Sequence, residues 1–376
     1  MKQIVVLGSG MVGSAIALDM ASQHSVLVAD KNEENLQKLK KKNTSIKTSI
    51  LDVTDEIELT KILKPADLVI CAVPGFLGFQ TMEKIIKNKK NVVDISFFPE
   101  NALELNELAI KNGVTAVVDC GVAPGMGNII LGHYDRLFQI ENFTCMVGGL
   151  PEEKKWPFYY KAPFSPVDVI EEYTRPARFV ENGFLITREA LSDVELMDFD
   201  EVGSLEAFNS DGLRSLIFTM PHIKNMKEKT LRYPGHVEYI QVLKKTGFFD
   251  STPVEIDGNK VKPIDFTSKI LFGEWKLGEK EKELTIMEIA MEGKSEERPK
   301  KVTYRLLDRF DGTTGISSMA RTTGYTATAV ANFMLSGHLN QLGILPPELV
   351  GKVDGCLPYV LGYLSERGVK YHKTEL

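Results

Sequence analysis

Short apolar runs alternate with amphipathic segments along the first third of the chain. The apolar runs are rich in Val and Ile and are closed by Gly, Asp or Pro, as is typical of strands buried on both faces of a parallel sheet. They comprise residues 3–8, 25–30, 67–73, 91–96 and 114–121. Helical patterns separate them, and one of these, residues 100–112, ends at a Gly113 suited to a helix stop. The alternation predicts an α/β fold with a doubly wound parallel sheet.

The pattern changes after about residue 140. Strand-like runs now follow one another, and the last two alternate apolar and polar positions: Met287, Ile289 and Met291 would face one way, with Glu288 and Glu292 facing the other. Such alternation is typical of a half-exposed antiparallel sheet. A long helical pattern rich in Ala and Thr then covers residues 317–337. We therefore expect a second, mixed α/β domain, followed by a segment that returns to the first.

A glycine-rich turn lies between the first strand and the first helix. Residues 5–17 read VVLGSGMVGSAIA and place Gly8, Gly10 and Gly13 in the order G-x-G-x-x-G. In this context the first glycine permits a tight turn, the second admits a pyrophosphate and the third allows close helix packing, while the helix N-terminus attracts phosphate. The turn therefore predicts a Rossmann domain that binds a dinucleotide. The alternative is that the glycines only make a tight turn.

Asp30 ends the second predicted strand. A carboxylate at this position accepts hydrogen bonds from the ribose hydroxyls and repels a 2′-phosphate, which favours NAD over NADP. Lys31 follows directly and would weaken that preference, and Asp30 or Asp52 would also serve as a helix cap. The residues expected to contact the cofactor are Gly8, Gly10, Met11, Val12, Gly13, Asp30, Asp52, Val53, Val73 and Pro74.

Composition narrows the possible functions. A net charge of −6 argues against nonspecific nucleic-acid binding, and no run of about 18 apolar residues predicts a membrane span. The four cysteines form no C-x-x-C pair, which suits a reducing cytoplasm, and the six histidines have no metal-ligand spacing. We expect a cytoplasmic protein without a bound metal.

A second glycine-rich turn follows the last of the early strands. Residues 117–128 read VVDCGVAPGMGN, too late in the sheet to hold the pyrophosphate. Ligands of open α/β sheets bind at the carboxyl ends of strands, so we expect Asp119 beside the cofactor. The turn itself is expected to be the exit from the first domain.

The chain resembles the saccharopine dehydrogenase–like family. The resemblance rests on the two glycine turns and on FNSDGLRSL, EKTLRYPGH and MARTTG, which occur here in the family's order (residues 208–216, 228–236 and 319–324). VGGLP, FSPVDVIEEYTRPAR and TLRYPGH look more like lysine 6-dehydrogenases than saccharopine reductases. The resemblance implies NAD-dependent oxidation of the ε-amine of L-lysine to 2-aminoadipate 6-semialdehyde, which cyclises, with release of ammonia. It also implies a Rossmann domain over residues 1–128, a substrate-binding and dimerisation domain over 129–316, and a return of 317–376 to the first domain.

Candidate residues for this chemistry follow from what it requires. Oxidation of an amine needs a base, for which Asp119 and His133 are candidates. A structural role is as plausible for Asp119, and a lone helical histidine such as His133 is more often structural. Arginine suits the substrate carboxylate because its guanidinium donates two parallel hydrogen bonds. The candidate substrate contacts are Arg175, Asp211, Arg214 and Arg232, with Glu171 or Glu172 as alternatives to Asp211 for the α-ammonium.

Two other functions stay open at this point. A saccharopine-type dehydrogenase would act on a secondary amine between two amino acids, and the arginines would suit its three carboxylates. A non-catalytic NAD-binding sensor would bind the cofactor without turnover. The aromatic segment 156–166 suits either a lid or a contact between subunits, and we expect a homodimer or a higher homo-oligomer.

Overall fold

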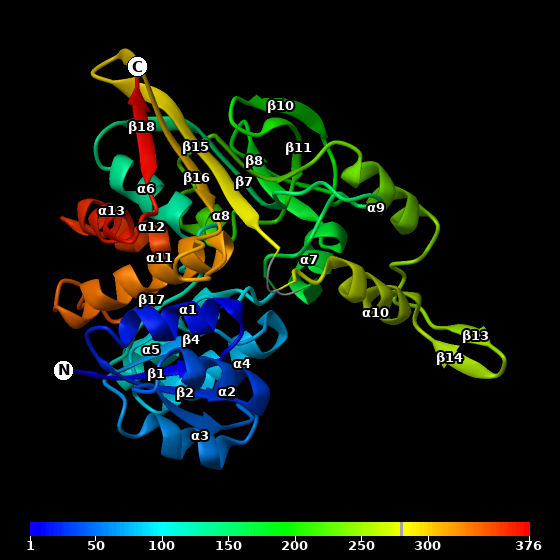
Figure 1. Ribbon diagram of the computed structural model, residues 1–376. Helices are drawn as coiled ribbons and strands as arrows, with labels where there is room; N and C mark the ends of the chain where they lie inside the picture. Colours follow the sequence, from blue (N-terminus) through cyan, green and yellow to red (C-terminus); the bar gives the residue numbers. More distant parts are fainter. Residues whose placement is uncertain (165, 279–280) are drawn as a thin grey trace.

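The computed structural model describes residues 1–164, 166–278 and 281–376, and it contains two large sheets (Figure 1). The first is a parallel, seven-stranded sheet in the order β17-β6-β5-β4-β1-β2-β3. Its strands are β1 (Gln3–Leu7), β2 (Ser25–Asp30), β3 (Lys47–Ile50), β4 (Leu68–Cys71), β5 (Val92–Asp94), β6 (Thr115–Val117) and β17 (Gly343–Leu345). This confirms the predicted doubly wound α/β fold.

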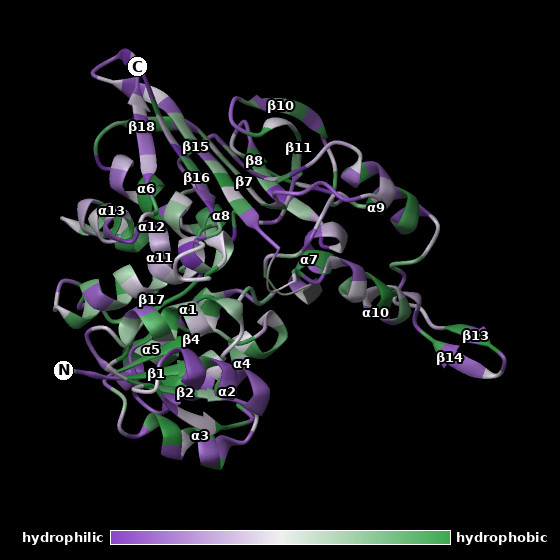
Figure 2. Cartoon of the chain, in the orientation of Figure 1, coloured by the Kyte–Doolittle hydropathy of each residue, from purple (hydrophilic) through white to green (hydrophobic). Residues whose placement is uncertain are grey.

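Successive residues of these strands enter two different cores, one on each face of the sheet. In β1, Ile4 and Val6 pack into one core while Val5 and Leu7 pack into the other, and all four are fully buried. Burial on both faces explains why the strands read as continuous apolar runs, and Figure 2 shows hydrophobic colouring concentrated there. The helices on the two faces are α1 (Met11–Met20), α2 (Glu33–Lys42) and α11 (Ser318–Leu335) on one, and α3 (Glu56–Leu63), α4 (Gly75–Lys87) and α5 (Asn106–Asn112) on the other. The helical pattern at 100–112 ends as predicted, with Gly113 in a left-handed conformation (φ 69°).

The second sheet has nine strands and is mixed. Its central order is β10-β11-β12-β7-β15-β16-β18; β12 and β7 are parallel, and β8 and β9 are attached beside β12. The strands are β7 (Gln139–Pro151), β8 (Ala177–Glu181), β9 (Phe184–Arg188), β10 (Glu195–Phe199), β11 (Gly203–Asn209), β12 (Asn225–Arg232), β15 (Glu283–Ser295), β16 (Arg298–Arg309) and β18 (Tyr371–Glu375). Met287, Ile289 and Met291 are buried whereas Glu288 and Glu292 are partly exposed, in agreement with the alternation in the sequence.

Residues after 317 contribute to both sheets. Helix α11 packs on α1, and β17 pairs with β6 at the edge of the parallel sheet. The last strand departs from the expected return to the first domain, because β18 pairs with β16 of the second sheet. There it covers backbone groups that an edge strand would otherwise leave unpaired.

The remaining elements include a short 3-10 helix of the first domain, elements that connect the sheets or cover the second one, and a separate two-stranded hairpin. They are η1 (Ala102–Leu105), α6 (Met126–Tyr134), α7 (Pro166–Thr174), α8 (Leu216–Thr219), α9 (His236–Lys245), β13 (Val254–Ile256), β14 (Asn259–Val261), α10 (Pro263–Trp275), α12 (Pro347–Gly351) and α13 (Cys356–Glu366). The β13–β14 hairpin projects from the end of α10 (Figure 1). Over the described ranges, no helix has the length and hydropathy needed to cross a membrane, and no three His, Cys, Asp or Glu side chains form a metal-binding group.

Candidate functional site

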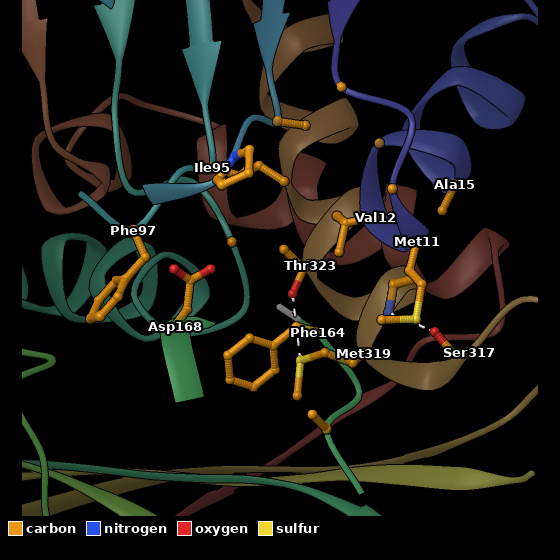
Figure 3. Close-up of a pocket in the computed structure, with 18 of the residues that line it drawn as sticks. Met11, Val12, Ala15, Ile95, Phe97, Phe164, Asp168, Ser317, Met319 and Thr323 are labelled. Atoms are coloured by element: carbon orange, nitrogen blue, oxygen red, sulfur yellow. Dashed lines mark hydrogen bonds between the residues drawn. The ribbon is translucent and has the colours of Figure 1, made fainter. Parts of the chain in front are cut away.

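A cavity of about 1540 Å³ lies between the carboxyl ends of the parallel strands and the second sheet. It is larger than the roughly 300–1,000 Å³ of ordinary small-molecule sites. Met11 and Val12 of the first glycine turn, Met319 and Thr323 of α11, and Phe97 and Phe164 surround the same space (Figure 3). Its position is the one that open α/β sheets use for ligands. Every residue predicted to contact the cofactor lines this cavity.

The first glycine turn has the geometry of a phosphate-binding turn. Gly8 has a φ of 104°, and a Cβ on it would overlap the carbonyl oxygen of Ala72; a Cβ on Gly13 would overlap that of Gly8. A Cβ on Gly10, in contrast, would meet no atom within 4 Å. Two glycines are therefore required by packing, while Gly10 leaves open space in front of the N-terminus of α1. This is the shape that a dinucleotide pyrophosphate fits.

Asp30 joins this turn to the end of β2. Its Oδ2 accepts hydrogen bonds from the Ser9 backbone nitrogen (2.6 Å) and hydroxyl (2.8 Å), and its Oδ1 accepts one from the Asn32 nitrogen (2.7 Å). Asn32, not Asp30, is the N-cap of α2. Asp30 is thus fixed on the cavity wall, where a ribose of the cofactor would lie.

Asp52 also lines the cavity and is not a helix cap. It accepts hydrogen bonds from the Thr54 nitrogen (2.9 Å) and hydroxyl (2.7 Å), which lower the pKa of Asp52. The N-cap of α3 is Asp55, whose side chain accepts from Ile57 and Glu58. The capping alternative for Asp52 is therefore wrong.

Basic residues of α2 lie beside Asp30 on the rim of the cavity. Lys31, which precedes α2, and Lys38, Lys41 and Lys42 of α2 all contribute to the lining. This end of the cavity combines one fixed carboxylate with several lysines. It therefore carries charges that favour and charges that disfavour a 2′-phosphate.

Asp119 and Arg214 form a buried ion pair at the end of β6. Arg214 Nε lies 3.1 and 3.0 Å from the two Asp119 oxygens, and Nη2 lies 2.9 Å from Oδ1. Arg214 Nη1 also donates to the carbonyl of Phe98 at 2.6 Å. Burial opposes the charge on Arg214, but the carboxylates of Asp119, Asp211 and Asp94 together outweigh burial and raise the Arg214 pKa. Asp119 lines the cavity and Arg214 lies behind it, so Asp119 is positioned as a counter-ion rather than as a free base.

The guanidinium of Arg232 is engaged by several neighbouring groups of the protein. Its guanidinium donates to the Tyr173 hydroxyl (2.9 Å), the Leu231 carbonyl (2.9 Å) and Glu172 (2.8 Å), and it stacks on the Tyr160 ring at 4.5 Å. The side chain lines the cavity but is only 2% exposed. Its donors are therefore largely used inside the protein.

Arg175 is less completely paired. It forms an ion pair with Glu171 and lies 4.9 Å from the centre of the Phe97 ring, and its Nη1 is buried without a partner among the described residues. It lines the cavity beside Glu172. Of the three arginines predicted to bind substrate, Arg175 lines the cavity with the fewest hydrogen-bond partners among the described residues. Ser165, in the family-like segment that precedes it, lies outside the described residues.

Asp211 lines the cavity and is paired with Arg178. Arg178 Nε and Nη2 donate to the two Asp211 oxygens at 2.8 and 2.9 Å. Asp211 therefore enters the site as one half of an ion pair, as do Glu171 and Glu172.

The structure removes His133 from the site. His133 is absent from the cavity lining that the described residues form, and its ring contacts that of Tyr134 on α6. Burial, together with Arg136 and Lys373, lowers the His133 pKa. The helical period left its direction open, and packing of α6 turns it away from the cavity.

Glu228 is the acidic side chain that the sequence interpretation missed. On β12, Glu228, Thr230 and Arg232 alternate and all three line the cavity. Glu228 is 8% exposed, and its carboxyl group forms no hydrogen bond or ion pair with any described residue. Burial, and then the carboxylates of Glu172, Asp211 and Asp119, raise the Glu228 pKa to about 8. The available signal was the alternation in the EKTLR motif, which put Glu228 on the same face as Arg232.

The fold and this cavity define a two-domain α/β protein. One part of the cavity is formed by a glycine turn suited to a dinucleotide, and another part, here called the chamber, is lined by charged side chains: Asp119, Glu171, Glu172, Asp211, Glu228, Arg175 and Arg232. The family described as Saccharopine dehydrogenase NADP binding domain matches residues 4–117, and the Saccharopine dehydrogenase C-terminal domain matches residues 121–369. The chain belongs to the saccharopine dehydrogenase family, which confirms the resemblance at that level.

Individual relatives extend this comparison. "Saccharopine dehydrogenase [NADP(+), L-glutamate-forming]" of Schizosaccharomyces pombe is 29% identical over 68% of this chain and 60% of its own length. "Alpha-aminoadipic semialdehyde synthase, mitochondrial" of Bos taurus is 26% identical over 66% of this chain and 28% of its own length. "Carboxyaminopropylagmatine dehydrogenase" of Synechocystis is 21% identical over 100% of this chain and 98% of that protein. The chain thus corresponds to only part of the first two relatives.

Among solved structures, apo saccharopine dehydrogenase (L-Glu forming) from Saccharomyces cerevisiae matches with a TM-score of 0.81 and 21% identity, covering 100% of both chains. At this identity the match shows the fold, including the mixed second domain.

Proposed function

We propose that this protein is an NAD-dependent dehydrogenase that oxidises the ε-amine of L-lysine to 2-aminoadipate 6-semialdehyde and releases ammonia. The observation that carries this proposal is the charge of the chamber beside the glycine turn. Its carboxylates include Asp119, Asp211 and the unpartnered Glu228, whereas Arg232 is occupied by Glu172 and tyrosine hydroxyls. An excess of carboxylates favours a substrate that carries two ammonium groups and one carboxylate.

Each part of the substrate has a candidate contact. Arg175 is suited to the carboxylate because it lines the cavity and its guanidinium is paired, among the described residues, with one carboxylate only, that of Glu171. Asp211 and Glu171 are suited to the α-ammonium. We propose that residues 1–128 bind the cofactor and that 129–316 bind the substrate, with α11 and β17 completing the first unit.

The cofactor would be held by the first glycine turn and by Asp30. Gly8, Gly10 and Gly13 fit the pyrophosphate, and Asp30 supports NAD. When bound, the nicotinamide supplies the two-electron acceptor that amine oxidation needs. The family description and the S. pombe relative name NADP, so cofactor preference must be measured together with activity.

The experiment is a spectrophotometric assay of the purified protein with NAD or NADP and with L-lysine, saccharopine or ornithine, coupled to ammonia detection. The proposal expects reduced cofactor and equimolar ammonia with L-lysine and NAD. Turnover of saccharopine without ammonia would instead support a saccharopine-type dehydrogenase, the second candidate, which the names of the relatives favour. Tight cofactor binding with no turnover of any amine would support the sensor.

We also propose a cytoplasmic homodimer. The four cysteines are unpaired and buried, which suits a reducing compartment. Trp156, in the aromatic segment suggested as a lid or a subunit contact, is 76% exposed, while Tyr160 of the same segment is buried against Arg232. Light scattering on the wild type and on Trp156→Ser would test the dimer and this contact.

A further inference from the structure

The reaction proposed above needs a base. At neutral pH the ε-amine of lysine is protonated, since its reference pKa is about 10.4. An ammonium has no lone pair to assist departure of the C–H electron pair. A group inside the cavity must therefore accept a proton before oxidation, and a proton must be returned when ammonia leaves.

Most acidic residues of the chamber are already engaged. Asp119 accepts from Arg214, Asp211 from Arg178, Glu172 from Arg232 and Glu171 from Arg175. A carboxylate held by a guanidinium already has a permanent cation as its partner. Glu228 lacks such a partner.

The position of Glu228 is fixed by close packing against Gly212. A Cβ on Gly212 would occupy the place of the Glu228 Oε1 atom, so only glycine leaves room for this carboxyl group. The side chain shares one face of β12 with Thr230 and Arg232 and reaches the cavity, although the residue is 8% exposed. A rigid, desolvated and otherwise unused carboxyl group is thus directed at the substrate chamber.

We propose that Glu228 is the catalytic base of this protein, accepting the proton of the substrate ε-ammonium inside the cavity. This assignment rests on the proposed function. Glu228 takes the N–H proton, which leaves the lone pair on nitrogen. A bound nicotinamide would supply the acceptor for the electron pair of the C–H bond, and the nitrogen lone pair would then form the C=N bond of an iminium ion. Water adds to that carbon and loses one proton to solvent, and Glu228 returns its proton to the nitrogen. The C–N bond then breaks as the hydroxyl proton passes back to Glu228, so that ammonia leaves and the aldehyde forms.

Charges around Glu228 are consistent with this role. Glu172 of α7, Asp211 of the loop after β11 and Asp119 after β6 add negative potential, and Arg214 partly offsets it. Cys145 on the paired strand β7 is neutral, because burial and then Glu228 raise its pKa well above the ordinary value. Burial and the three carboxylates raise the Glu228 pKa to about 8, closer to that of an amine than an ordinary glutamate would be.

The test compares wild type with Glu228→Gln, which keeps the shape of the side chain but cannot accept the proton. We expect kcat to fall by about 100- to 10,000-fold. In wild type, kcat/KM should rise as the pH passes through about 8, and this rise should be absent in the variant. Cofactor affinity, measured by fluorescence titration, should be unchanged. Glu201→Gln, at an exposed position between β10 and β11, is the matched control and should keep the wild-type profile.

Two further variants keep the test decisive if Glu228→Gln folds poorly. Gly212→Ala retains the carboxyl group but displaces it, and should lower kcat while cofactor still binds. Glu228→Ala should regain part of its activity when formate or acetate is added, which a purely structural residue would not do. A Glu228→Gln enzyme within about threefold of wild type, or one that keeps the rise near pH 8, overturns the assignment.

The substrate and the base fail in different ways. If wild type oxidises saccharopine but not L-lysine, the proposed substrate is wrong, and the same comparison of pH profiles with saccharopine decides the role of Glu228. If wild type binds cofactor and oxidises no amine, both proposals are wrong.

Discussion

Asp119 and Arg214, which lie 95 positions apart in the sequence, form an ion pair that links the parallel sheet to the second domain. Both residues adopt left-handed backbone conformations, with φ of 52° and 51°. Non-glycine residues in this region cost on the order of 1–3 kcal/mol each. The pair therefore stabilises two unfavourable backbone conformations as well as two buried charges.

Breaking this pair should destabilise the protein strongly. Removing one partner of a buried pair leaves an uncompensated charge and costs about 3–5 kcal/mol. We expect Arg214→Gln and Asp119→Asn each to lower the free energy of unfolding in urea by this amount, and the double variant to lose less than the sum. Lys61→Gln, which breaks an exposed pair with Glu58, should cost about 0–1 kcal/mol. Additive effects of the two buried substitutions would contradict the pairing.

Substitutions of two glycines in the first turn should have different effects, one on protein stability and the other on cofactor affinity. Gly13→Ala places a methyl group against the Gly8 carbonyl and should cost about 1–3 kcal/mol of stability. Gly10 has an ordinary φ of −65° and open space beyond it, so Gly10→Ala should leave the thermal midpoint nearly unchanged. It should nevertheless weaken dinucleotide binding by at least about tenfold, because the pyrophosphate would lie against the new methyl group. Calorimetry and fluorescence titration measure the two effects, and unchanged affinity in Gly10→Ala would remove the pyrophosphate from this turn.

Glu283 should make stability depend on pH. Its Oε1 accepts from the Ser318 nitrogen at the start of α11, its Oε2 has no partner, and burial raises its pKa to about 7. Because the pKa is raised in the folded state, the stabilisation is fully present below about pH 4.5 and is lost as the pH rises through about 7. Glu283→Gln removes this titration, so its stability relative to wild type should increase by on the order of 2–3 kcal/mol between pH 4.5 and 8.

Urea unfolding at both pH values tests this dependence on Glu283. Glu228 titrates in the same direction but is present in both proteins, so its contribution cancels. Glu104→Gln, at an exposed position, is the control and should show no such change. A stability difference that is constant across the range would exclude Glu283 as the titrating group.

The sequence predicted the features that depend on local patterns. Continuous apolar runs predict strands that are buried on both faces, and alternation of apolar and polar residues predicts β15 and β16. The conformation of the first glycine turn depends only on residues next to it in the sequence and on the end of β4, so its motif can be recognised locally. These local patterns were sufficient to predict the fold class, the phosphate-binding glycine turn and the position of Asp30 at the end of β2. They also placed the start of α11, whose packing on α1 follows from its small residues.

Roles that depend on long-range contacts were harder to infer. Whether Asp119 is a base or a counter-ion depends on Arg214, and whether Arg232 is available depends on Tyr173 and Glu172. The sequence places Glu228 in a strand but does not show which face of β12 lines the cavity, so it gave no reason to select Glu228. To predict whether His133 faces the cavity, the orientation of α6 must be known, and the helical period alone does not give this orientation.

Substitutions of Arg175 and Arg232 should have different consequences. Arg175→Ala removes the partly unused guanidinium and should raise the KM for the amino acid by about 10- to 100-fold with kcat little changed, since binding is lost equally from ground and transition states. Arg232→Ala leaves Glu172 and two tyrosine hydroxyls without their partner, so it should mainly lower the free energy of unfolding by several kcal/mol. Initial rates and urea unfolding of both variants test this, with the exposed Arg188→Ala as control. A normal KM in Arg175→Ala would exclude it as the carboxylate ligand.

Cofactor preference should depend on the balance between Asp30 and the lysines around it. Asp30→Ala removes the carboxylate that opposes a 2′-phosphate and releases Ser9, so kcat/KM for NAD should fall by about 10- to 100-fold while that for NADP changes less or rises. Lys31→Ala should act in the opposite direction and strengthen the preference for NAD, because it removes positive charge from the same rim. Measuring kcat/KM for both cofactors in the three proteins separates these effects. An NADP preference in wild type that Lys31→Ala reduces would show that the lysines beside Asp30 outweigh its carboxylate. An unchanged cofactor ratio in Asp30→Ala would remove Asp30 from the ribose site.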